Sequence, residues 1–403
     1  ILGGGMVGGY AVGEMVERGV GPGEVCIISD DSALPYKRPP LSKDFLKGEI
    51  EEPEVFINDP GLYADHGIEV RLDTHVDAVD LEAREIAGEG FTIGFDTLLI
   101  ATGAWPRPLP APGAHLDGVH LLRTLAHCRA IKAEAADARR AVVIGGGFIG
   151  MELAAGLTVL GVDTTLVYRE ERVMVGRFPE PIAEYFEDYY RARGVELIAG
   201  ADVASIEGVG RVSGVMLGDG RTLPADMVVA GIGVTPRVEL FEGGPLTLDD
   251  GIVVNEYLEA GVEGVYVAGD SARYHDVLFD RLRRFEHADN AQAQGKHVAG
   301  VMLGERAPFR HVPNFYSDMF DLSWNYYGDR SAGERVIYRG TVASGEFVAW
   351  WLADDGRPVA AFVLGIPWQE AEVTAQVIEQ GKAIPEDVLT DESVALGELV
   401  EGA

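Results

Sequence analysis

The chain has 403 residues, a length that suits two or three domains, and no apolar run approaches the roughly 18 residues of a membrane-spanning helix. Apolar residues make up 47% of it and charged residues 24%, as in ordinary globular proteins. The 65 acidic and 33 basic residues give a formal net charge of −32, which argues against nucleic-acid binding because phosphates require a basic surface.

The chain opens with ILGGGMVG at residues 1–8, followed by a helix-like pattern over 10–18 and an apolar strand at 25–29. This order predicts a βαβ unit. Its glycines have the GxGxxG spacing: the first permits a tight turn, the second lets a pyrophosphate approach the backbone, and the third allows close helix packing. They are Gly3, Gly5 and Gly8. Asp31 follows Gly8 by 23 residues, near the spacing expected for a ribose contact.

A further buried strand is expected at residues 97–103, TLLIATG. The glycine pattern then recurs as VIGGGFIG at 143–150, before a helix-like stretch at 151–160 and a strand at 164–168. The second set of glycines is Gly145, Gly147 and Gly150. Two such units predict two bound dinucleotides, and the economical pairing is a resident flavin with a visiting nicotinamide.

The residues after the second unit bear on which nicotinamide binds. Glu170 follows Gly150 by 20 residues and is the expected ribose contact. A carboxylate there repels a 2′-phosphate, whereas Arg169 or Arg172 could bind one. The position of Glu170 favours NADH, and NADPH stays open.

The remaining apolar strands complete the predicted architecture, an α/β fold with two Rossmann-like domains. Residues 227–233 and 265–270 match short buried strands, and alternating segments at 347–352 and 359–364 predict antiparallel strands. We expect the second nucleotide domain to be inserted into the first, with a C-terminal α+β domain after them. The expected limits are 1–108 and 235–305 for the first domain, 109–234 for the insert and 306–403 for the last. The acidic tail, 384–403, is expected to be exposed.

Several segments resemble the flavoprotein reductases that include ferredoxin and rubredoxin reductases, apoptosis-inducing factor and plant monodehydroascorbate reductases. The first is PYKRPPLSK at residues 35–43, and the others follow in the family's order through nearly the whole chain. These are ATG at 101–103, GIGVTP at 231–236, VYVAGD at 265–270 and FEHADNAQAQG at 285–295. PNFYSDMFDLSWNYYGD at 313–329 and VYREERVMVGRF at 167–178 look most like the plant enzymes.

The resemblance implies a glutathione-reductase-type fold with a C-terminal interface domain, and FAD as the flavin. It implies that Lys43 approaches the flavin ring and pairs with Glu152, although the residues alone would suggest two surface charges. By the same resemblance Glu286 and His287 border the nicotinamide, with His287 a catalytic candidate. The other FAD contacts that it implies are Arg38, Thr102, Gly103 and Asp270. Asp270 would grip a ribityl hydroxyl or cap a helix.

The two cysteines bear on the reaction. Disulfide reductases of this fold carry reactive cysteines near the flavin, but residues 35–43 have none. Cys26 and Cys128 are expected to be small buried hydrophobes, so the flavin would pass electrons outward directly. Two cysteines are too few for a disulfide framework or a multi-cysteine metal site, and we expect no metal. Such a low cysteine content is typical of a protein in the reducing cytoplasm. The high acid content with only six lysines suits a salt-adapted surface or simply a biased composition.

Three acceptor hypotheses remain open, for a monomer or a homodimer. The favoured one is electron transfer to a ferredoxin-type iron–sulfur protein, with the basic run 281–284 as a docking patch or else a solvated cluster at a helix start. The second is reduction of a small organic radical, as in monodehydroascorbate reductases; Tyr316 is retained, but Gln292 stands where those enzymes carry an arginine. The third is an NADH sensor that resembles apoptosis-inducing factor.

Overall fold

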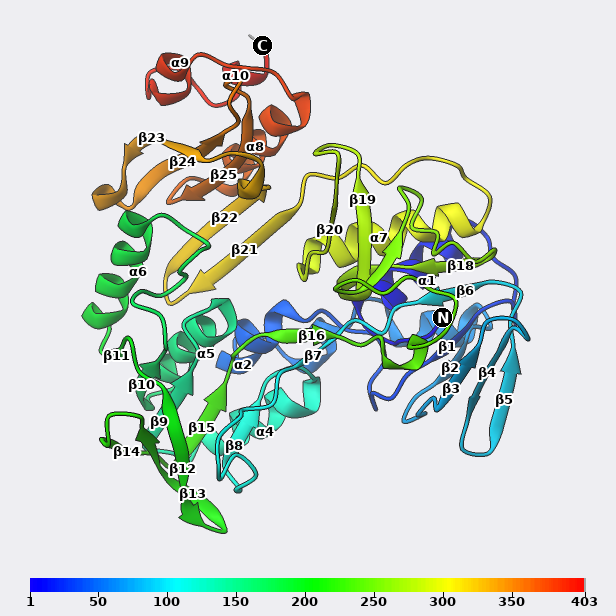
Figure 1. Cartoon of the computed structure of the whole chain (residues 1–403), viewed down its shortest axis with the longest axis horizontal. Coiled ribbons are helices and arrows are strands. Elements are labelled where there is room, and N and C mark those ends of the chain that lie inside the picture. Colours follow the sequence, from blue (N-terminus) through cyan, green and yellow to red (C-terminus); the bar gives the residue numbers. More distant parts are fainter. Residues whose placement is uncertain (402–403) are drawn as a thin grey trace.

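The structure of the protein is a computed structural model, and it describes residues 1–401. Figure 1 shows three connected parts: a Rossmann-like domain that contains the N-terminus, a second Rossmann-like domain, and an antiparallel sheet that leads to the C-terminus. The two Rossmann-like domains are called the first and second nucleotide folds. No helix in the described part of the chain is long and apolar enough to cross a membrane.

The first nucleotide fold is built on short parallel strands. β1 pairs with β2, β6 pairs with β18, and Leu2 bridges the two pairs through Ile28 and Ile100. The helices α1 and α7 pack against each other, so a chain segment almost 300 residues away completes this fold. These elements are α1 (Met6–Glu17), β1 (Cys26–Ile28), β2 (Glu69–Arg71), β6 (Leu98–Ile100), β18 (Val265–Val267) and α7 (Ala288–Met302).

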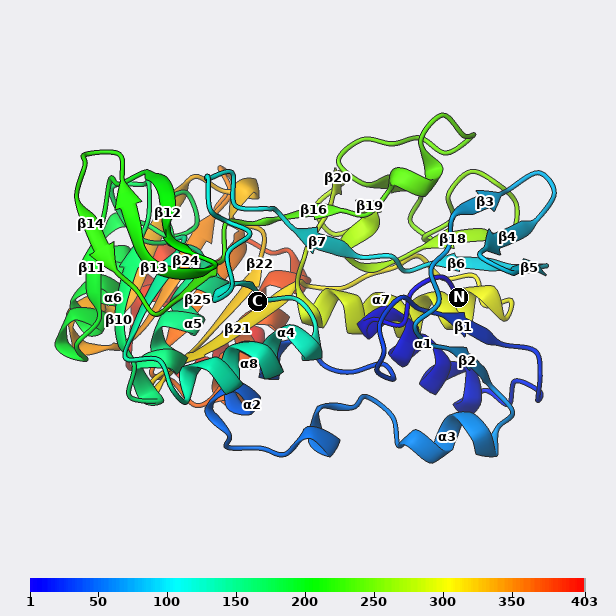
Figure 2. The same ribbon diagram turned by 90° about the horizontal axis from the view of Figure 1, so that it is seen from below.

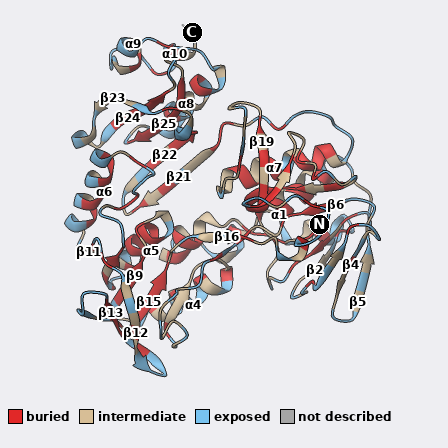
Figure 3. Ribbon diagram, viewed as in Figure 1, coloured by how far each residue is buried: buried red, intermediate tan, exposed pale blue. Residues whose placement is uncertain are grey.

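The second nucleotide fold has a five-stranded parallel sheet in the order β11-β10-β9-β15-β8. β9 and β15 and the helix α5 are largely buried (Figure 3), which explains their nearly continuous apolar sequences. The strands are β8 (Val119–Leu121), β9 (Arg140–Ile144), β10 (Asp163–Val167), β11 (Glu196–Ile198) and β15 (Met227–Ala230). The helices are α4 (Leu125–Ala135), α5 (Phe148–Val159) and α6 (Glu180–Ala192).

Two antiparallel strands, β7 (Ala104–Pro106) and β16 (Val234–Pro236), run between the nucleotide folds. Figure 2 shows them side by side in the middle of the molecule. Small sheets flank the two folds, in the orders β3-β4-β5, β12-β13-β14 and β17-β19-β20. Their strands are β3 (Ala78–Asp80), β4 (Glu85–Gly88), β5 (Phe91–Gly94), β12 (Val203–Val209), β13 (Arg211–Leu217), β14 (Thr222–Pro224), β17 (Ile252–Val254), β19 (Ala272–Asp276) and β20 (Arg281–Arg283).

The C-terminal part is an antiparallel sheet in the order β21-β22-β25-β24-β23. Its first strand packs against α5 and α7, which brings C-terminal side chains to the two nucleotide folds. The elements are β21 (Asn314–Met319), β22 (Leu322–Gly328), β23 (Arg335–Thr341), β24 (Glu346–Leu352), β25 (Pro358–Leu364), α8 (Trp368–Gln380), α9 (Glu386–Thr390) and α10 (Glu398–Glu401). Two short helices lie elsewhere, α2 (Asp44–Lys47) and α3 (Pro60–Asp65).

The expected exposure of the tail holds for its acidic side chains over residues 384–400 but not for its leucines, and residues 402–403 lie outside the described part of the chain. Leu389, Leu396 and Leu399 are buried and pack with Trp350 and Ile378 in the core of the C-terminal sheet. The acidic residues of the tail hide this apolar spacing in the sequence, because leucines three to seven positions apart form only one stripe.

Candidate functional site

A cavity of about 1050 Å³ lies between the two nucleotide folds and the C-terminal sheet. Both glycine turns line it, through residues 3–7 and 145–149. So do Lys43, Glu152 and Tyr316, which come from three distant parts of the chain.

The first glycine turn has the shape that a dinucleotide requires. Gly3 has a φ of 121°, and a Cβ there would lie 2.2 Å from the carbonyl oxygen of Ala101. A Cβ on Gly8 would lie 2.5 Å from the carbonyl oxygen of Gly3, whereas a Cβ on Gly5 would meet nothing within 4 Å. Gly5 also precedes α1 without a side-chain cap, so no side chain of the N-cap residue satisfies the first N–H groups of that helix.

The second turn repeats these relations. Gly145 has a φ of 120°, and its Cβ would lie 2.4 Å from the carbonyl oxygen of Gly231. A Cβ on Gly150 would lie 1.9 Å from the carbonyl oxygen of Gly145, but Gly147 again has open space around it. Each turn is therefore closed toward the protein and open toward the cavity, and both fit a dinucleotide pyrophosphate.

Lys43 and Glu152 form a buried ion pair, as the resemblance implied and the residues alone did not. The Nζ of Lys43 donates to Oε1 of Glu152 at 2.5 Å, and the two residues are only 5% and 3% exposed. The hydroxyl of Ser317 donates to the same Oε1 at 2.6 Å, and Ser42 donates to Oε2. Both carboxylate oxygens are thus satisfied, which a buried charge requires.

Three elements position this pair. Lys43 directly follows a tight turn of helix at Pro39–Ser42, Glu152 lies in the first turns of α5, and Ser317 lies on β21. The Lys43 Nζ also lies 5.5 Å from the centre of the Tyr316 ring, which is 43% exposed. The ammonium group and its carboxylate partner therefore both lie at the cavity wall.

On the side of the first glycine turn, Asp31, Tyr36 and Arg38 form a connected network. The Tyr36 hydroxyl donates to Oδ2 of Asp31 at 2.6 Å, and Nη1 of Arg38 donates to the Tyr36 hydroxyl at 2.9 Å. Arg38 also donates to the backbone carbonyl of Arg123, and both Asp31 and Arg38 line the cavity. Burial lowers the pKa of Arg38, the nearby Arg123 lowers it further, and Tyr36 and Asp31 oppose the decrease.

Arg123 is a cavity residue that sequence reasoning missed. Its Nη2 donates to Oδ2 of Asp270 at 3.0 Å and would lie 3.1 Å from a Cβ on Gly103. The Thr102 hydroxyl donates to the backbone carbonyl of Arg237 at 2.7 Å, and Thr102, Gly103 and Asp270 all line the cavity. No local motif marks Arg123, since it lies 147 residues from Asp270 in sequence.

Glu286 and His287 lie on the cavity wall at the start of α7. Glu286 accepts a hydrogen bond of 2.7 Å from Arg284. The His287 ring stacks on Phe315, with centroids 5.1 Å apart. The pKa of His287 is lowered to about 4, chiefly by desolvation and also by Arg177, while Asp289 and Asp270 oppose the decrease. The imidazole is therefore neutral at neutral pH.

The residues that follow β10 are also placed at the cavity. Arg169, Glu170 and Arg172 all line it. Glu170 is exposed, and Arg169 is exposed with its closest carboxylate, that of Asp202, at 3.9 Å. Arg172 contacts carboxylates of α6 instead.

Neither cysteine lines the cavity. Cys128 is fully buried on α4, where its thiol contacts the carbonyl oxygen of Leu41 at 3.1 Å and burial raises its pKa to about 12. The expectation that Cys26 is also buried is wrong, because this residue, the first of β1, is only half-buried. Among the described residues, no three His, Cys, Asp or Glu side chains gather as metal ligands.

The basic run 281–284 is neither a free patch nor a helix start. Its residues 281–283 form β20, and Arg283 is buried between Asp276 and Asp329. Arg281 also contacts Asp329, and Arg284 contacts Asp250 and Glu286. Each guanidinium is therefore neutralised within the protein, which corrects the expected docking patch.

Two dinucleotide cradles that open into one cavity beside a buried lysine define a two-nucleotide oxidoreductase. The family model for pyridine nucleotide-disulphide oxidoreductases matches residues 1–295, and that for the C-terminal domain of monodehydroascorbate reductase 3-like proteins matches residues 312–396. The chain belongs to the pyridine nucleotide-disulphide oxidoreductase family. It is an NAD(P)H-dependent FAD oxidoreductase of the group that the resemblance indicated.

Individual relatives include both kinds of reductase. A peroxisomal monodehydroascorbate reductase 4 from Arabidopsis thaliana is 38% identical, with 98% of this chain and 85% of the relative aligned. Putidaredoxin reductase CamA from Pseudomonas putida is 32% identical, with 94% and 92% aligned. In the solved covalent complex of putidaredoxin reductase with putidaredoxin, the matched chain is 31% identical and has a TM-score of 0.94, with 100% of this chain and 97% of that chain covered.

Proposed function

We propose that this protein oxidises NADH through bound FAD and passes the electrons singly to a ferredoxin-type iron–sulfur protein. The observation that carries the proposal is the buried Lys43–Glu152 pair at the wall of a cavity that both glycine turns share. The absence of a thiol from the cavity lining supports direct transfer to an external acceptor. The few cysteines further suit a cytoplasmic location.

FAD, when bound, supplies acceptance of a hydride from nicotinamide and one-electron transfer to an acceptor. We propose that Gly3, Gly5 and Gly8 with the α1 N-terminus hold its pyrophosphate. The further holding residues are Asp31, Arg38, Thr102, Gly103 and Asp270. Gly145, Gly147 and Gly150 would hold the nicotinamide dinucleotide in the same way, with Glu170 at its ribose and Glu286 at its nicotinamide end.

Lys43 would stabilise negative charge that develops in the cavity during reduction, because a fixed ammonium group in a site of low dielectric needs no reorganisation. Glu152 holds that ammonium at the wall, and the hydroxyls of Ser42 and Ser317 fix the carboxylate. His287, being neutral, would shape the aromatic wall rather than supply charge.

The preference for NADH over NADPH rests on Glu170, which is exposed at the cavity where a 2′-phosphate would be repelled. The preference for an iron–sulfur partner rests on similarity in fold and length to putidaredoxin reductase.

Replacing Lys43 with Ala should slow reduction of the bound flavin by NADH by about 10²-fold, the scale of losing one preorganised charge contact. Glu152→Gln should have a smaller effect in the same direction. Stopped-flow absorbance measures the rate, and the FAD content of each purified variant shows whether the cofactor is retained. Lys47→Ala is the matched control, because Lys47 pairs with the partly exposed carboxylates of Asp44 and Glu49 and is not among the residues that line the cavity. Unchanged flavin reduction in both variants would refute these roles.

A small organic radical is the second candidate acceptor, and Tyr316 favours it. Its ring is partly exposed at the cavity wall beside Lys43, where a small molecule could reach it. Gln292 lies on α7 and is half-buried, outside the cavity lining. If radicals are the acceptors, Gln292→Arg should raise turnover with monodehydroascorbate severalfold. No gain, together with cytochrome c reduction through an added ferredoxin, would leave the iron–sulfur partner as the acceptor.

A further inference from the structure

Arg172 ends the loop that carries Glu170, and its guanidinium is enclosed by carboxylates of α6. It contacts Glu184 Oε1 at 2.6 Å, Glu187 Oε2 at 3.1 Å and Glu180 Oε1 at 3.4 Å. Three carboxylates thus surround a guanidinium that also lines the cavity, and one of them, Glu187, is shared with Arg191.

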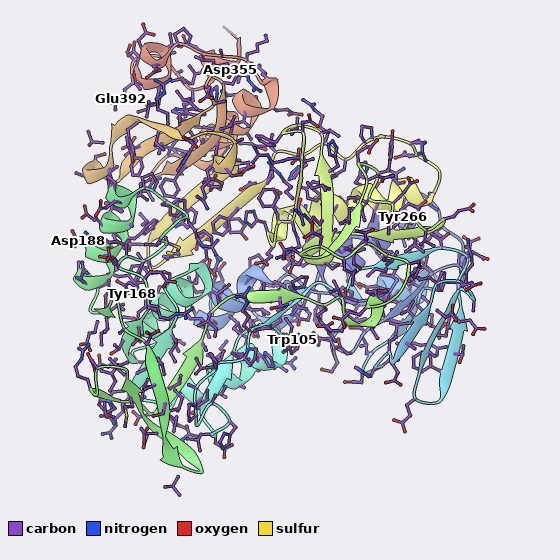
Figure 4. All side chains as sticks on the ribbon, in the orientation of Figure 1. Trp105, Tyr168, Asp188, Tyr266, Asp355 and Glu392 are labelled. Atoms are coloured by element: carbon purple, nitrogen blue, oxygen red, sulfur yellow. The ribbon has the colours of Figure 1, made fainter. Side chains whose placement is uncertain are left out.

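Glu187 is the buried member of this set, and its side chain is only 1% exposed. Its Oε1 accepts hydrogen bonds from the Tyr168 hydroxyl at 3.1 Å and from the Val173 N–H at 3.1 Å. One carboxylate therefore fixes both ends of the loop 169–172 to α6. Figure 4 labels Tyr168, which follows β10, and Asp188, which lies on α6 next to Glu187 in sequence.

The other arginine of the loop is held differently. Arg169 is 76% exposed, and its closest carboxylate lies 3.9 Å away on the equally exposed Asp202. A guanidinium binds phosphate through free N–H donors in a planar fork. At Arg172 both Nη atoms donate to carboxylates of α6, and an approaching 2′-phosphate would also meet the charges of Glu180 and Glu184.

We propose that Glu187, with Glu180 and Glu184, is a second determinant of nicotinamide choice that acts by withholding Arg172 from 2′-phosphorylated nucleotides. Glu187 is a positioning residue here, since it acts through Arg172 and the loop. The inference rests on the proposed NADH preference, because it explains how a site with two nearby arginines rejects NADPH.

The test measures the Kd of the FAD-loaded protein for NADP⁺ and NAD⁺ by fluorescence titration at low salt. Glu187→Gln keeps an oxygen for Val173 and Tyr168 but removes the charge that holds Arg172. We expect its Kd for NADP⁺ to fall about tenfold, the scale of one charge-assisted hydrogen bond, and its Kd for NAD⁺ to stay within about twofold. The double variant Glu180→Gln, Glu184→Gln changes two exposed residues and should lower the ratio of the Kd for NADP⁺ to the Kd for NAD⁺ by a smaller factor. It tests the inference if Glu187→Gln does not fold.

Two further variants separate this mechanism from a general structural effect. Asp188→Asn, the control, removes a carboxylate of α6 that contacts Arg191 and not Arg172, so the ratio should not change. Adding Arg172→Ala to Glu187→Gln should abolish the gain in NADP⁺ binding. Three results would overturn the inference. These are tighter NADP⁺ binding that persists without Arg172, equal changes in the Kd values for NADP⁺ and NAD⁺, or no change in either Kd in the Glu187 variant and the Glu180, Glu184 double variant. Equal binding of NAD⁺ and NADP⁺ by the unmodified protein would instead refute the proposed NADH preference, while the dependence on Glu187 and Arg172 is still read from the variants.

Discussion

His287 immediately precedes α7 and lies between two aromatic rings, with centroids 5.2 Å from Phe285 and 5.1 Å from Phe315. Its Nδ1 is buried without a hydrogen-bond partner in the part of the chain that the structure describes. An imidazole in these surroundings resists protonation, because the ring environment solvates the charged form poorly. This residue is therefore a source of pH-dependent stability as well as part of the cavity wall.

The pKa of His287 is lowered from 6.5 to about 4, mainly by desolvation. As the pH falls from about 6.5 to about 4, the unfolded chain binds a proton that the folded chain does not, so stability is lost over that interval. Urea unfolding of the FAD-loaded protein should show a decrease of at most about 3 kcal/mol attributable to this residue. His287→Gln should lose that part of the pH dependence. Identical slopes in the two proteins would show that His287 titrates normally.

At the scale of residues, motif spacing and resemblance located the charged members of the site but not their supports. Lys43 and Glu152 were predicted to pair, and they do. Ser317 and Arg123 were missed, because Ser317 lies 165 residues from Glu152 and Arg123 lies 147 residues from Asp270. Hydroxyl and guanidinium groups that support a site from another element carry no local pattern, so only the packed fold identifies them.

At the scale of elements, the helix starts show what glycine does in these turns. The patterns predicted helices from 10 and 151, but α1 begins at Met6 and α5 at Phe148. The third glycine of each motif lies inside its helix, where it permits contact with the preceding turn. Helix propensity alone penalises such a glycine and therefore places the start too late.

Replacing two glycines of the second turn with alanine should have different effects, one on nucleotide binding and the other on stability. Gly147→Ala adds a Cβ that meets no protein atom within 4 Å but lies where a pyrophosphate would approach. We expect unchanged thermal stability and a Kd for NAD⁺ raised at least about tenfold. Gly150→Ala places its Cβ 1.9 Å from the Gly145 carbonyl oxygen and should lower the free energy of unfolding by about 1–3 kcal/mol. Normal NAD⁺ binding by Gly147→Ala would mean that the nucleotide does not approach this backbone.

At the scale of the whole molecule, the net charge of −32 affects how an acidic partner protein can approach the surface. The predicted docking patch fails because Arg281 and Arg283 share Asp329, a residue that lies 46 positions beyond Arg283 and could not be foreseen next to it. Overall charge follows from composition, but which cations are free depends on the fold. An acidic iron–sulfur protein would therefore approach a surface of like charge.

Long-range repulsion of this kind weakens as salt screens it. The Debye length shortens from about 30 Å at about 0.01 M salt to about 8 Å at about 0.15 M. The rate constant for electron transfer to an acidic ferredoxin should therefore rise severalfold over this range, whereas attraction by a local basic patch would make it fall. Stopped-flow mixing of the pre-reduced enzyme with oxidised ferredoxin measures this step apart from NADH binding. A neutral quinone is the control acceptor, and its rate should hardly change; a ferredoxin rate that falls with salt would show that free cations face the partner after all.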